Sequence, residues 1–291
     1  MSERERRLRV AIIGSGNIGS DLLAKIARSD TLELVGMAGV EPSSEGLARA
    51  AAAGVQTTHL GLADLLEHCD ELDIAFDATS ASAHAEHARL LAERGIRSID
   101  LTPASLGPAV VPSVNLGAHA DAPDVNLITC GAQATVPIVA ALANVGTVTY
   151  AEIVSTVAAR SAGPGTRQNI DEFTQATAAA LETVGGAQRG KAIILLNPAE
   201  PPIMMRNTVY AELPGADPAA VIEAVEEVVA AVASYVPGYH LTAAPLIDGD
   251  LVTVLLEVEG AGDYLPRYAG NLDIMTSAAV RVAETYARER V

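Results

Sequence analysis

The stretch Leu8–Gly19, LRVAIIGSGNIG, decides the fold expected for the first half of the chain. Its first six residues are mostly apolar and predict a buried strand, while Leu22, Leu23 and Ile26 have helical spacing. The GxGxxG turn between them consists of Gly14, Ser15, Gly16, Asn17, Ile18 and Gly19. In such a turn the first Gly permits the tight bend, the second lets a pyrophosphate approach the backbone, and the third allows close helix–strand packing. We therefore predict a dinucleotide site with its phosphates at the N-terminus of a helix.

Strand and helix patterns alternate after this turn. We expect strands at Leu32–Val40, Ile74–Thr79 and Ile96–Leu101, and helices at Leu60–His68 and Ala81–Arg94. This alternation predicts a parallel, doubly wound sheet whose ligands lie at the carboxyl ends of the strands. The loops that begin at Gly14, Thr79, Thr102 and Cys130 are expected to open onto that edge.

Glu41 stands at the end of the second predicted strand, about 20 positions after the glycines. An acidic residue at this place binds a ribose 2′-hydroxyl, which favours NAD over NADP. The alternative interpretation of Glu41 is a solvent-exposed turn residue.

Cys130 follows a short apolar run and precedes the long alanine-rich run Val136–Ala143. This pattern indicates a strand, a sharp turn and a helix. A cysteine at the start of a helix lies near unpaired N–H groups and the positive end of the helix dipole, which favour the nucleophilic thiolate. The alternative is a buried structural cysteine before a core helix. The other cysteine, Cys69, is expected in an acidic surface turn.

The pattern changes after Asn144. We expect strands at Tyr150–Ala159, Lys191–Leu196, Ile203–Leu213 and Leu251–Glu259, and helices at Asp171–Gly185, Asp217–Ser234 and Asn271–Glu289. These elements predict an α+β domain with one sheet, in which adjacent strands run antiparallel. The expected fold is α/β: a Rossmann-type NAD-binding domain (1–130), an α+β catalytic and dimerisation domain (131–270), and a last helix (271–291) that packs back on the first domain.

The composition excludes several classes of protein. Of the 291 residues 49% are apolar, and the net charge is −17, which argues against disorder and against general binding of nucleic acid or anionic membranes. Two cysteines are too few for a disulfide framework or a cysteine-based zinc site. His84 and His87 are three positions apart without a third ligand nearby, so we expect a solvated helix face and no metal site. No signal peptide or membrane span is expected, and we predict a soluble, cytoplasmic protein.

Five motifs, spread from one end of the chain to the other, resemble one family. They are Gly14–Gly19, Thr129–Thr135, Ser161–Arg167, Asn197–Pro202 and Gly270–Thr276. The chain resembles the CoA-acylating acetaldehyde dehydrogenases, which pair with 4-hydroxy-2-oxovalerate aldolase in the meta-cleavage degradation of aromatic compounds or steroids. The last four motifs are far more specific than GxGxxG.

The resemblance implies roles for individual residues. Cys130 would form the acyl-enzyme, and Asn169 would be a catalytic amide that donates to the oxyanion. The alternative role of Asn169 is the N-cap of the helix that starts near Asp171. The NAD-binding set would comprise Ser161, Ala162, Gly163, Pro164, Gly165, Thr166, Arg167, Asn169 and Asn271. An aspartate that often serves as general base in the family is replaced here by Asn207, which cannot accept a proton at neutral pH.

The resemblance also implies the reaction and the partners. A short-chain aldehyde (acetaldehyde or propanal), NAD⁺ and CoA would give acyl-CoA and NADH through a cysteine thioester. We expect a hetero-oligomer, two plus two, with the aldolase subunit, and self-dimerisation is also possible. The phosphates of CoA need cations nearby. The segment from Arg160 to Arg206 contains five cations and four anions, a local charge of +1 in an acidic chain, so we expect the phosphates to bind near this segment.

Two other functions stay open at this point. A phosphorylating semialdehyde dehydrogenase would share the layout and the cysteine but is expected to have a histidine base, and His240 is the only histidine in the second domain. A non-catalytic NAD-binding subunit of the aldolase is favoured only by Asn207.

Overall fold

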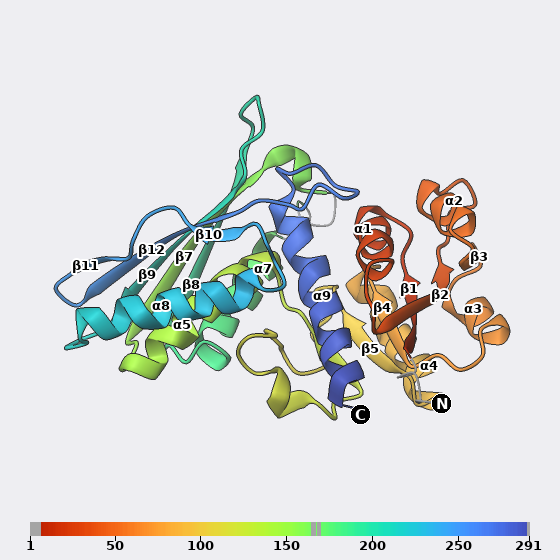
Figure 1. Cartoon of the computed structure of the whole chain (residues 1–291), viewed down its shortest axis with the longest axis horizontal. Helices are drawn as coiled ribbons and strands as arrows, with labels where there is room; N and C mark the ends of the chain where they lie inside the picture. Colours follow the sequence, from red (N-terminus) through yellow and green to blue (C-terminus); the bar gives the residue numbers. More distant parts are fainter. Residues whose placement is uncertain (1–6, 164–166, 168–169, 290–291) are drawn as a thin grey trace. The chain divides into compact units, whose positions relative to one another are not determined.

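The computed structural model describes residues 7–163, 167 and 170–289. The chain forms two compact units (Figure 1). Unit 1 contains Met1–Pro108, Gly117–Leu127 and Ala279–Val291, and unit 2 contains Ala109–Leu116 and Ile128–Ala278.

Unit 1 is built on a six-stranded sheet in the order β3-β2-β1-β4-β5-β6, with all neighbouring strands parallel. The strands are β1 (Leu8–Ile13), β2 (Leu32–Ala38), β3 (Gln56–Thr58), β4 (Ile74–Asp77), β5 (Arg97–Asp100) and β6 (Asp124–Asn126). The helical segments are α1 (Asn17–Ile26), α2 (Glu45–Ala52), α3 (Leu62–His68), α4 (Ala81–Glu93) and the 3-10 turn η1 (Leu116–His119). This strand order is that of a doubly wound nucleotide-binding sheet, so the predicted fold of this half is confirmed.

Burial explains why these segments form strands. Val10, Ala11 and Ile12 of β1 are completely buried, as expected for a central strand covered on both faces. Because all the strands run in one direction, the turns after β1, β4 and β5 lie at one edge of the sheet. That edge therefore carries Gly14, Thr79 and Thr102, as predicted.

Unit 2 contains a second sheet in the order β10-β12-β9-β7-β8, with β11 paired to β12. Its strands are β7 (Tyr150–Ala158), β8 (Gly190–Asn197), β9 (Met205–Glu212), β10 (Tyr239–Leu241), β11 (Leu246–Asp248) and β12 (Leu251–Val258). Its helical segments are α5 (Cys130–Val145), the 3-10 turn η2 (Ala159–Ser161), α7 (Ile170–Thr183) and α8 (Pro218–Ala233). The α+β class is confirmed. The expectation of antiparallel neighbours is wrong for β7 and β8, which are parallel because α7 forms the crossover between them.

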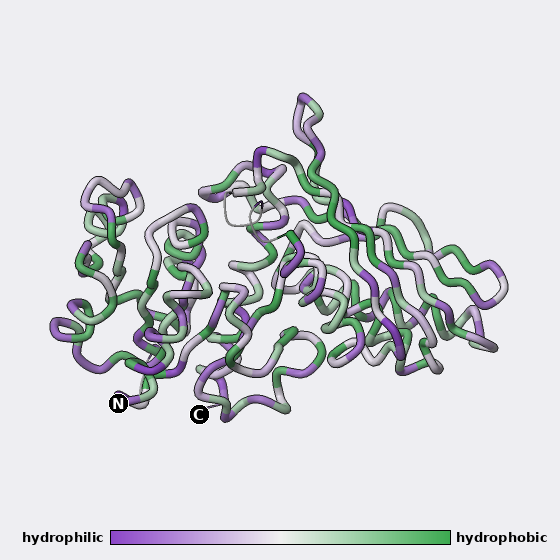
Figure 2. The backbone as a smooth tube through the Cα atoms, turned by 180° about the vertical axis from the view of Figure 1, so that it is seen from behind, coloured by the Kyte–Doolittle hydropathy of each residue, from purple (hydrophilic) through white to green (hydrophobic). Residues whose placement is uncertain are grey.

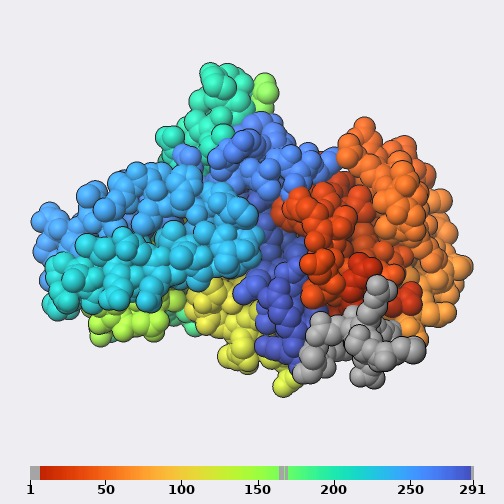
Figure 3. All heavy atoms as spheres, in the orientation of Figure 1, coloured from red at the N-terminus to blue at the C-terminus, as the bar shows by residue number. Residues whose placement is uncertain are grey.

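The strands of this second sheet have two different faces. In β7, Ala151, Ile153 and Ser155 are completely buried, whereas the residues between them are half-buried. The tube coloured by hydropathy shows hydrophobic and hydrophilic residues interspersed along these strands (Figure 2). The completely buried helix α5 residues Val136, Ile138 and Val139 pack in the same core as β7 and β9. Helix α8 has one side in that core and the other at the surface (Figure 3).

Helix α9 (Gly270–Glu289) begins in unit 2 and ends in unit 1. Within unit 1, Glu284 Oε1 accepts a 2.7 Å hydrogen bond from Ser29, and the Arg97 guanidinium lies 4.6 Å from the centre of the Tyr286 ring. These contacts attach the end of the helix to unit 1. Among the described residues, no helix has the length and apolar character needed to cross a membrane.

Candidate active site

The glycine-rich turn has the shape that a dinucleotide requires. Gly14 has a φ of +108°, and a Cβ atom there would lie 2.6 Å from the Ala78 carbonyl oxygen. A Cβ atom at Gly19 would lie 1.9 Å from the Gly14 carbonyl oxygen, so the start of α1 could not pack on the turn. Around Gly16, by contrast, no atom of a described residue beyond its own neighbours in the chain lies within 4 Å of the position of a Cβ. Gly14 and Gly19 thus serve the packing of the chain itself, while Gly16 leaves room for a ligand at the N-terminus of α1.

Glu41 lies just beyond β2, whose last residue, Ala38, accepts the backbone hydrogen bond of Gly14 at 2.8 Å. Its Oε1 accepts hydrogen bonds from the Ser43 hydroxyl (2.7 Å) and backbone N–H (3.1 Å). These bonds hold the pKa of the Glu41 carboxyl below its usual range, so the side chain is an exposed anion close to the glycine-rich turn.

Cys130 is the first residue of α5, as the sequence predicted. The helix is capped by Thr129, whose hydroxyl accepts a 3.0 Å hydrogen bond from the Ala132 N–H. Ile128, just before the cap, has a φ of +64°, a rare conformation for a β-branched residue. A strained residue at this turn brings the chain sharply from β6 into the helix and is typical of functional sites.

The ionisation of Cys130 depends on two opposing effects. Burial raises the pKa of the thiol to about 12, whereas the backbone N–H groups of Gly131 and of Cys130 itself lower it. The helix N-terminus favours the thiolate, but the loss of water outweighs the two backbone hydrogen bonds. Cys130 needs a proton acceptor before it can act as a nucleophile.

A buried polar pair lies beneath the first turn of α5. A Cβ atom at Gly131 would lie 3.1 Å from the Ser155 hydroxyl and 2.9 Å from the Phe173 ring. Ser155 donates a 2.7 Å hydrogen bond to Asn207 Oδ1 across the antiparallel strands β7 and β9. Asn207 Nδ2 is buried and has no hydrogen-bond partner among the described residues. The structure thus brings Asn207 to the underside of the turn that carries Cys130.

Asn271 and Ser161, two of the residues predicted to bind NAD, lie together although they are 110 positions apart. Asn271 Nδ2 donates a 3.3 Å hydrogen bond to the Ser161 carbonyl, while its buried Oδ1 has no partner in the described parts of the chain. Arg167 donates to the carbonyls of Ala162 (3.1 Å) and Ala159 (2.7 Å). Pro164, Gly165, Thr166 and Asn169 lie outside the described residues.

Unit 2 also contains a cavity of about 310 Å³. It is lined by Ala158, Ala159, Arg160, Arg167, Asn197, Pro198, Ala199, Glu200 and Pro202. Arg160 pairs with Glu200 at 2.8 Å, and elsewhere on unit 2 Lys191 pairs with Glu152 and Arg206 with Glu257, each at 3.0 Å. Most of the cations counted in the sequence are thus matched by carboxylates of the same unit.

Comparison with known proteins identifies the family. Residues 130–266 match a family model described as prokaryotic acetaldehyde dehydrogenase, dimerisation, and residues 9–122 match one described as semialdehyde dehydrogenase, NAD binding domain. An acetaldehyde dehydrogenase of Brevibacillus brevis is 59% identical over 285 residues, which cover 97% of each chain. One of Geobacillus stearothermophilus is 58% identical, with 98% of each chain covered.

The chain belongs to the acetaldehyde dehydrogenase family. Among solved structures, aspartate semialdehyde dehydrogenase II of Vibrio cholerae superposes with a TM-score of 0.65 over 98% of this chain and 100% of that one. At 15% sequence identity this likeness shows the fold alone. The resemblance inferred from the five motifs is confirmed.

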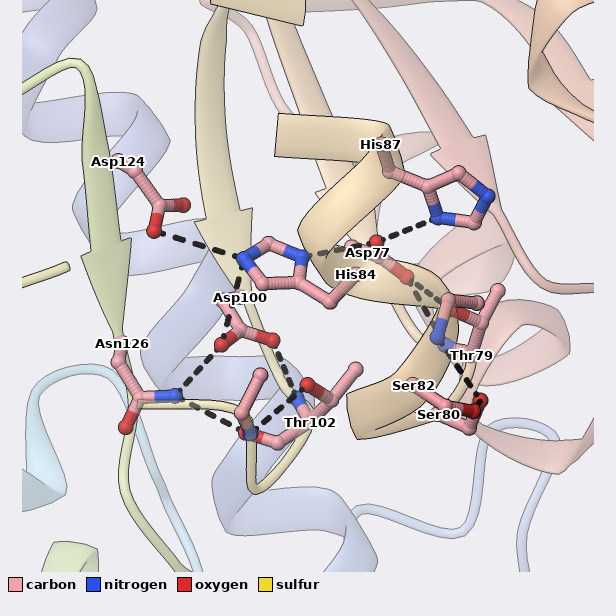
Figure 4. Close-up of polar contacts among 12 residues, drawn as sticks. Asp77, Thr79, Ser80, Ser82, His84, His87, Asp100, Thr102, Asp124 and Asn126 are labelled. Atoms are coloured by element: carbon pink, nitrogen blue, oxygen red, sulfur yellow. Dashed lines mark hydrogen bonds and ion pairs between the residues drawn. The ribbon is translucent and has the colours of Figure 1, made fainter. Parts of the chain in front are cut away.

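One feature of this acetaldehyde dehydrogenase homologue contradicts the sequence interpretation. His84 was expected on a solvated helix face, but its side chain is completely buried and both ring nitrogens face carboxylates (Figure 4). His87 is also largely covered and donates to the same carboxylate, Asp77, at 2.8 Å. The signal that could have revealed this was Asp77 itself, a charged residue at the end of a central apolar strand, which requires a buried partner.

Cys69 likewise differs from its expected place. It is 7% exposed and belongs to the hydrophobic core of unit 1, where α3 packs on β2. The polar neighbours His68 and Asp70 suggested a surface turn, but the apolar side of α3 carries the following residue into the core.

Proposed function

We propose that this protein oxidises a short-chain aldehyde, acetaldehyde or propanal, with NAD⁺ and transfers the acyl group to CoA. The observation that carries the proposal is the position of Cys130 at the capped start of α5, above a buried polar pair, in a chain of the acetaldehyde dehydrogenase family. The cysteine is the group that can hold the acyl chain between the two half-reactions.

In the first half-reaction the Cys130 sulfur loses its proton and attacks the aldehyde carbonyl carbon, which gives a hemithioacetal. The N–H groups of the first turn of α5 stabilise the negative charge that develops on the carbonyl oxygen, and Asn169 is the second candidate donor. NAD⁺, when bound, accepts the hydride that leaves the same carbon. The product on Cys130 is a thioester.

In the second half-reaction the thiol of CoA loses its proton and attacks the thioester carbon, and the Cys130 sulfur leaves. Both half-reactions begin with removal of a proton from a thiol. Asn207, where the family has an aspartate, cannot accept it. We infer that solvent or the substrate receives the proton in this protein, so that the rate at neutral pH is below what a carboxylate would allow.

The residues fit the cofactor. Gly16 leaves open space at the N-terminus of α1, where the pyrophosphate of NAD would lie, and the Glu41 carboxylate would bind the ribose 2′-hydroxyl. Asn271 Oδ1, which has no partner in the part of the chain that the structure describes, would accept a hydrogen bond from the carboxamide of the nicotinamide, together with backbone groups of Ser161–Arg167. The phosphates of CoA would approach Arg160 and Arg167 at the cavity of unit 2.

The uncovered face of the second sheet is the surface that we propose for self-association. Leu195, Tyr210 and Leu251 on this face are 48%, 37% and 41% exposed, whereas α5, α7 and α8 cover the opposite face. The family model that matches this unit is described as a dimerisation domain. Replacing Tyr210 by aspartate should convert a dimer into a monomer in light scattering, and an unchanged mass would contradict this surface.

The wider setting is proposed from the resemblance of the five motifs. We propose a cytoplasmic enzyme that works beside a 4-hydroxy-2-oxovalerate aldolase in meta-cleavage degradation of aromatic compounds or steroids. Co-expression with such an aldolase should give one complex, two plus two, in size-exclusion chromatography. Separate elution of the two proteins would contradict the partner but not the reaction.

The reaction itself is tested by NADH formation from acetaldehyde or propanal with CoA. Activity with CoA, and none with phosphate or arsenate, is the expected result. Activity with phosphate alone would identify a phosphorylating semialdehyde dehydrogenase. The candidate histidine base of such an enzyme, His240, is half-exposed, and among the described residues its ring contacts the nearby Gly238 carbonyl and the Glu257 carboxylate. NAD⁺ binding without turnover of any aldehyde would identify a non-catalytic subunit.

A further inference from the structure

A buried histidine lies at the carboxyl edge of the parallel sheet, away from Cys130 in the sequence and without a role in the reaction above. His84, on α4, has an exposed side-chain fraction of zero. Its Nδ1 lies 2.9 Å from Asp77 Oδ2, and its Nε2 lies 3.4 Å from Asp124 Oδ2 and 3.5 Å from Asp100 Oδ2 (Figure 4). Three successive neighbouring strands, β4, β5 and β6, thus each place a carboxylate against one imidazole ring.

The groups that face the two ring nitrogens indicate the charge of this histidine. A neutral imidazole has one N–H donor and one acceptor nitrogen, and a carboxylate facing the acceptor would be repelled. Because carboxylates face both nitrogens of His84, both must carry a proton. The hydrogen bonds that His84 donates to Asp124 and Asp77, together with the charge of Asp100, raise the pKa of His84 to about 10 against the opposing effect of burial, in agreement with this geometry.

Other polar groups near the ring come from α4, β5, β6 and α9. His87 of α4 shares Asp77 Oδ2 with His84, and Asn126 of β6 donates to Asp100 Oδ2 at 2.7 Å. From α9, Tyr286 lies near Asp124, with the Arg97 guanidinium over its ring. Asp100 is buried, which raises the pKa of its carboxyl, whereas the bonds from the two histidines and Thr79 lower that of Asp77.

The carboxylates that contact His84 also accept hydrogen bonds from two turns of the chain. Asp77 Oδ1 accepts hydrogen bonds from the Thr79 N–H (3.1 Å) and hydroxyl (2.5 Å), which fix the turn after β4. Asp100 Oδ1 accepts from the Thr102 N–H at 2.7 Å, which fixes the turn after β5. Asn126 donates to the Thr102 carbonyl at 2.9 Å and closes the second turn from β6.

The first of these turns supports the glycine-rich turn directly. The Ala78 carbonyl oxygen would lie 2.6 Å, and the Thr79 methyl 3.3 Å, from a Cβ atom at Gly14, so the backbone of one turn lies against the backbone of the other. Ala78 N–H also donates to the Ile13 carbonyl at 2.8 Å, just before Gly14. A shift of the turn after β4 therefore changes the space in which the pyrophosphate binds.

We propose that His84 is a permanently charged positioning residue: as an imidazolium it ties the turn after β4, on which Gly14 packs, to the turn after β5, and so preorganises the dinucleotide site. This rests on the proposed binding of NAD at that edge. His84 touches no reacting atom, and its loss should weaken cofactor binding far more than it slows the chemical step.

The charge is tested first, in the unmodified enzyme and without any activity measurement. Heteronuclear NMR of histidine-labelled protein, with the His84 signal assigned by its absence in His84→Gln, should show both ring nitrogens protonated from about pH 6 to about pH 9. The exposed His68 should titrate within that range and serves as the internal control. A neutral His84, or one that titrates near its ordinary pKa, would overturn the proposal even if the variants fail to fold.

The positioning role is tested by cofactor binding. In His84→Gln we expect Kd and KM for NAD⁺ to rise about 10-fold or more, with kcat at saturating NAD⁺ changed by less than about threefold. His87→Gln removes one hydrogen bond to Asp77 but leaves the links to β5 and β6, so its effect should be smaller, and His68→Gln should have none. The double variant His84→Gln/Asp124→Asn removes one of the facing carboxylates and should recover part of the lost affinity.

Each outcome decides a separate point. Unchanged Kd in a folded His84→Gln enzyme, or a double variant no better than the single one, would contradict the positioning role. Absence of NAD⁺ binding in the unmodified enzyme would contradict the proposed cofactor and with it this role, while the NMR result on the charge of His84 would stand.

Discussion

The histidine network of unit 1 and the cysteine site of unit 2 are both buried and polar, yet they are built in opposite ways. In the network, His84 faces a carboxylate with each nitrogen, and Asp77 accepts four hydrogen bonds. In unit 2, Asn207 Nδ2 beneath the turn of Cys130 and Asn271 Oδ1 beside Ser161 are buried without a partner among the described residues. The network is matched at His84 and at Asp77, although the buried Asp124 Oδ1 also has no hydrogen-bond partner among the described residues. Buried polar atoms without a partner cost free energy unless a ligand completes them.

The difference extends to the titratable groups. Neighbouring carboxylates make His84 a stable cation, whereas burial makes the Cys130 thiol a weak acid with few compensating bonds. The polar groups of His84 and Asp77 are thus matched within the chain, whereas Asn207 Nδ2, beneath the turn of Cys130, has no partner among the described residues. The predictions below test this contrast.

The largest effect is expected at the two cysteines. Cys130→Ala should reduce NADH formation by at least about 10³-fold with the fold intact, since the nucleophile is lost. Cys69→Ala, in the core of unit 1, should keep kcat within about twofold and lower the unfolding free energy slightly, because it removes only one buried atom. Initial rates and thermal unfolding of both variants give the answer, and equal losses of activity would refute the role of Cys130.

The second effect is on stability. His84→Gln should lower the free energy of unfolding by roughly 3–5 kcal/mol, since it leaves buried carboxylates without their partner. The raised pKa gives the sign of the pH dependence: the stabilisation is complete below the ordinary histidine pKa of 6.5 and disappears as the pH rises through about 10. Denaturant unfolding of both proteins between these limits should therefore converge toward high pH. A constant difference would show that packing rather than charge is lost.

The third effect concerns the missing base. Asn207→Asp should raise kcat near neutral pH by up to about 10²-fold and shift the acidic limb of the pH–rate profile to lower pH, because burial would tune the new carboxyl toward proton transfer. Ser155→Ala, which removes the hydrogen bond to Asn207, is the control for a disturbed pair and should not raise kcat. An Asn207→Asp enzyme slower at every pH would show instead that Asn207 positions a neighbour, since a new anion would raise the thiol pKa further.

The smallest effect is expected at Glu41. The native enzyme should prefer NAD⁺ to NADP⁺, because the exposed carboxylate repels a 2′-phosphate, and Glu41→Gln should reduce this preference by less than about tenfold. The kcat/KM values for both cofactors, measured at low and high salt, provide the test. A preference that does not change in the variant would leave Glu41 as an exposed turn residue.

Much of this protein was determined by local sequence patterns. The parallel sheet followed from the alternation of strands and helices, and the glycine-rich turn, Cys130 at the start of α5 and the family were all recognisable from short motifs. Such features depend on hydrophobic periodicity and on turns that need particular residues, and both are visible within a dozen positions.

Tertiary structure alone decided which polar groups meet. It buried His84 between carboxylates of three strands, paired β7 and β8 in parallel, carried Cys69 into the core, and set Asn207 beneath Gly131 with one amide atom free among the described residues. It also added the effect of burial on the Cys130 thiol, because the local effect of a helix N-terminus can be predicted from sequence, whereas the loss of water depends on every segment that packs around the thiol.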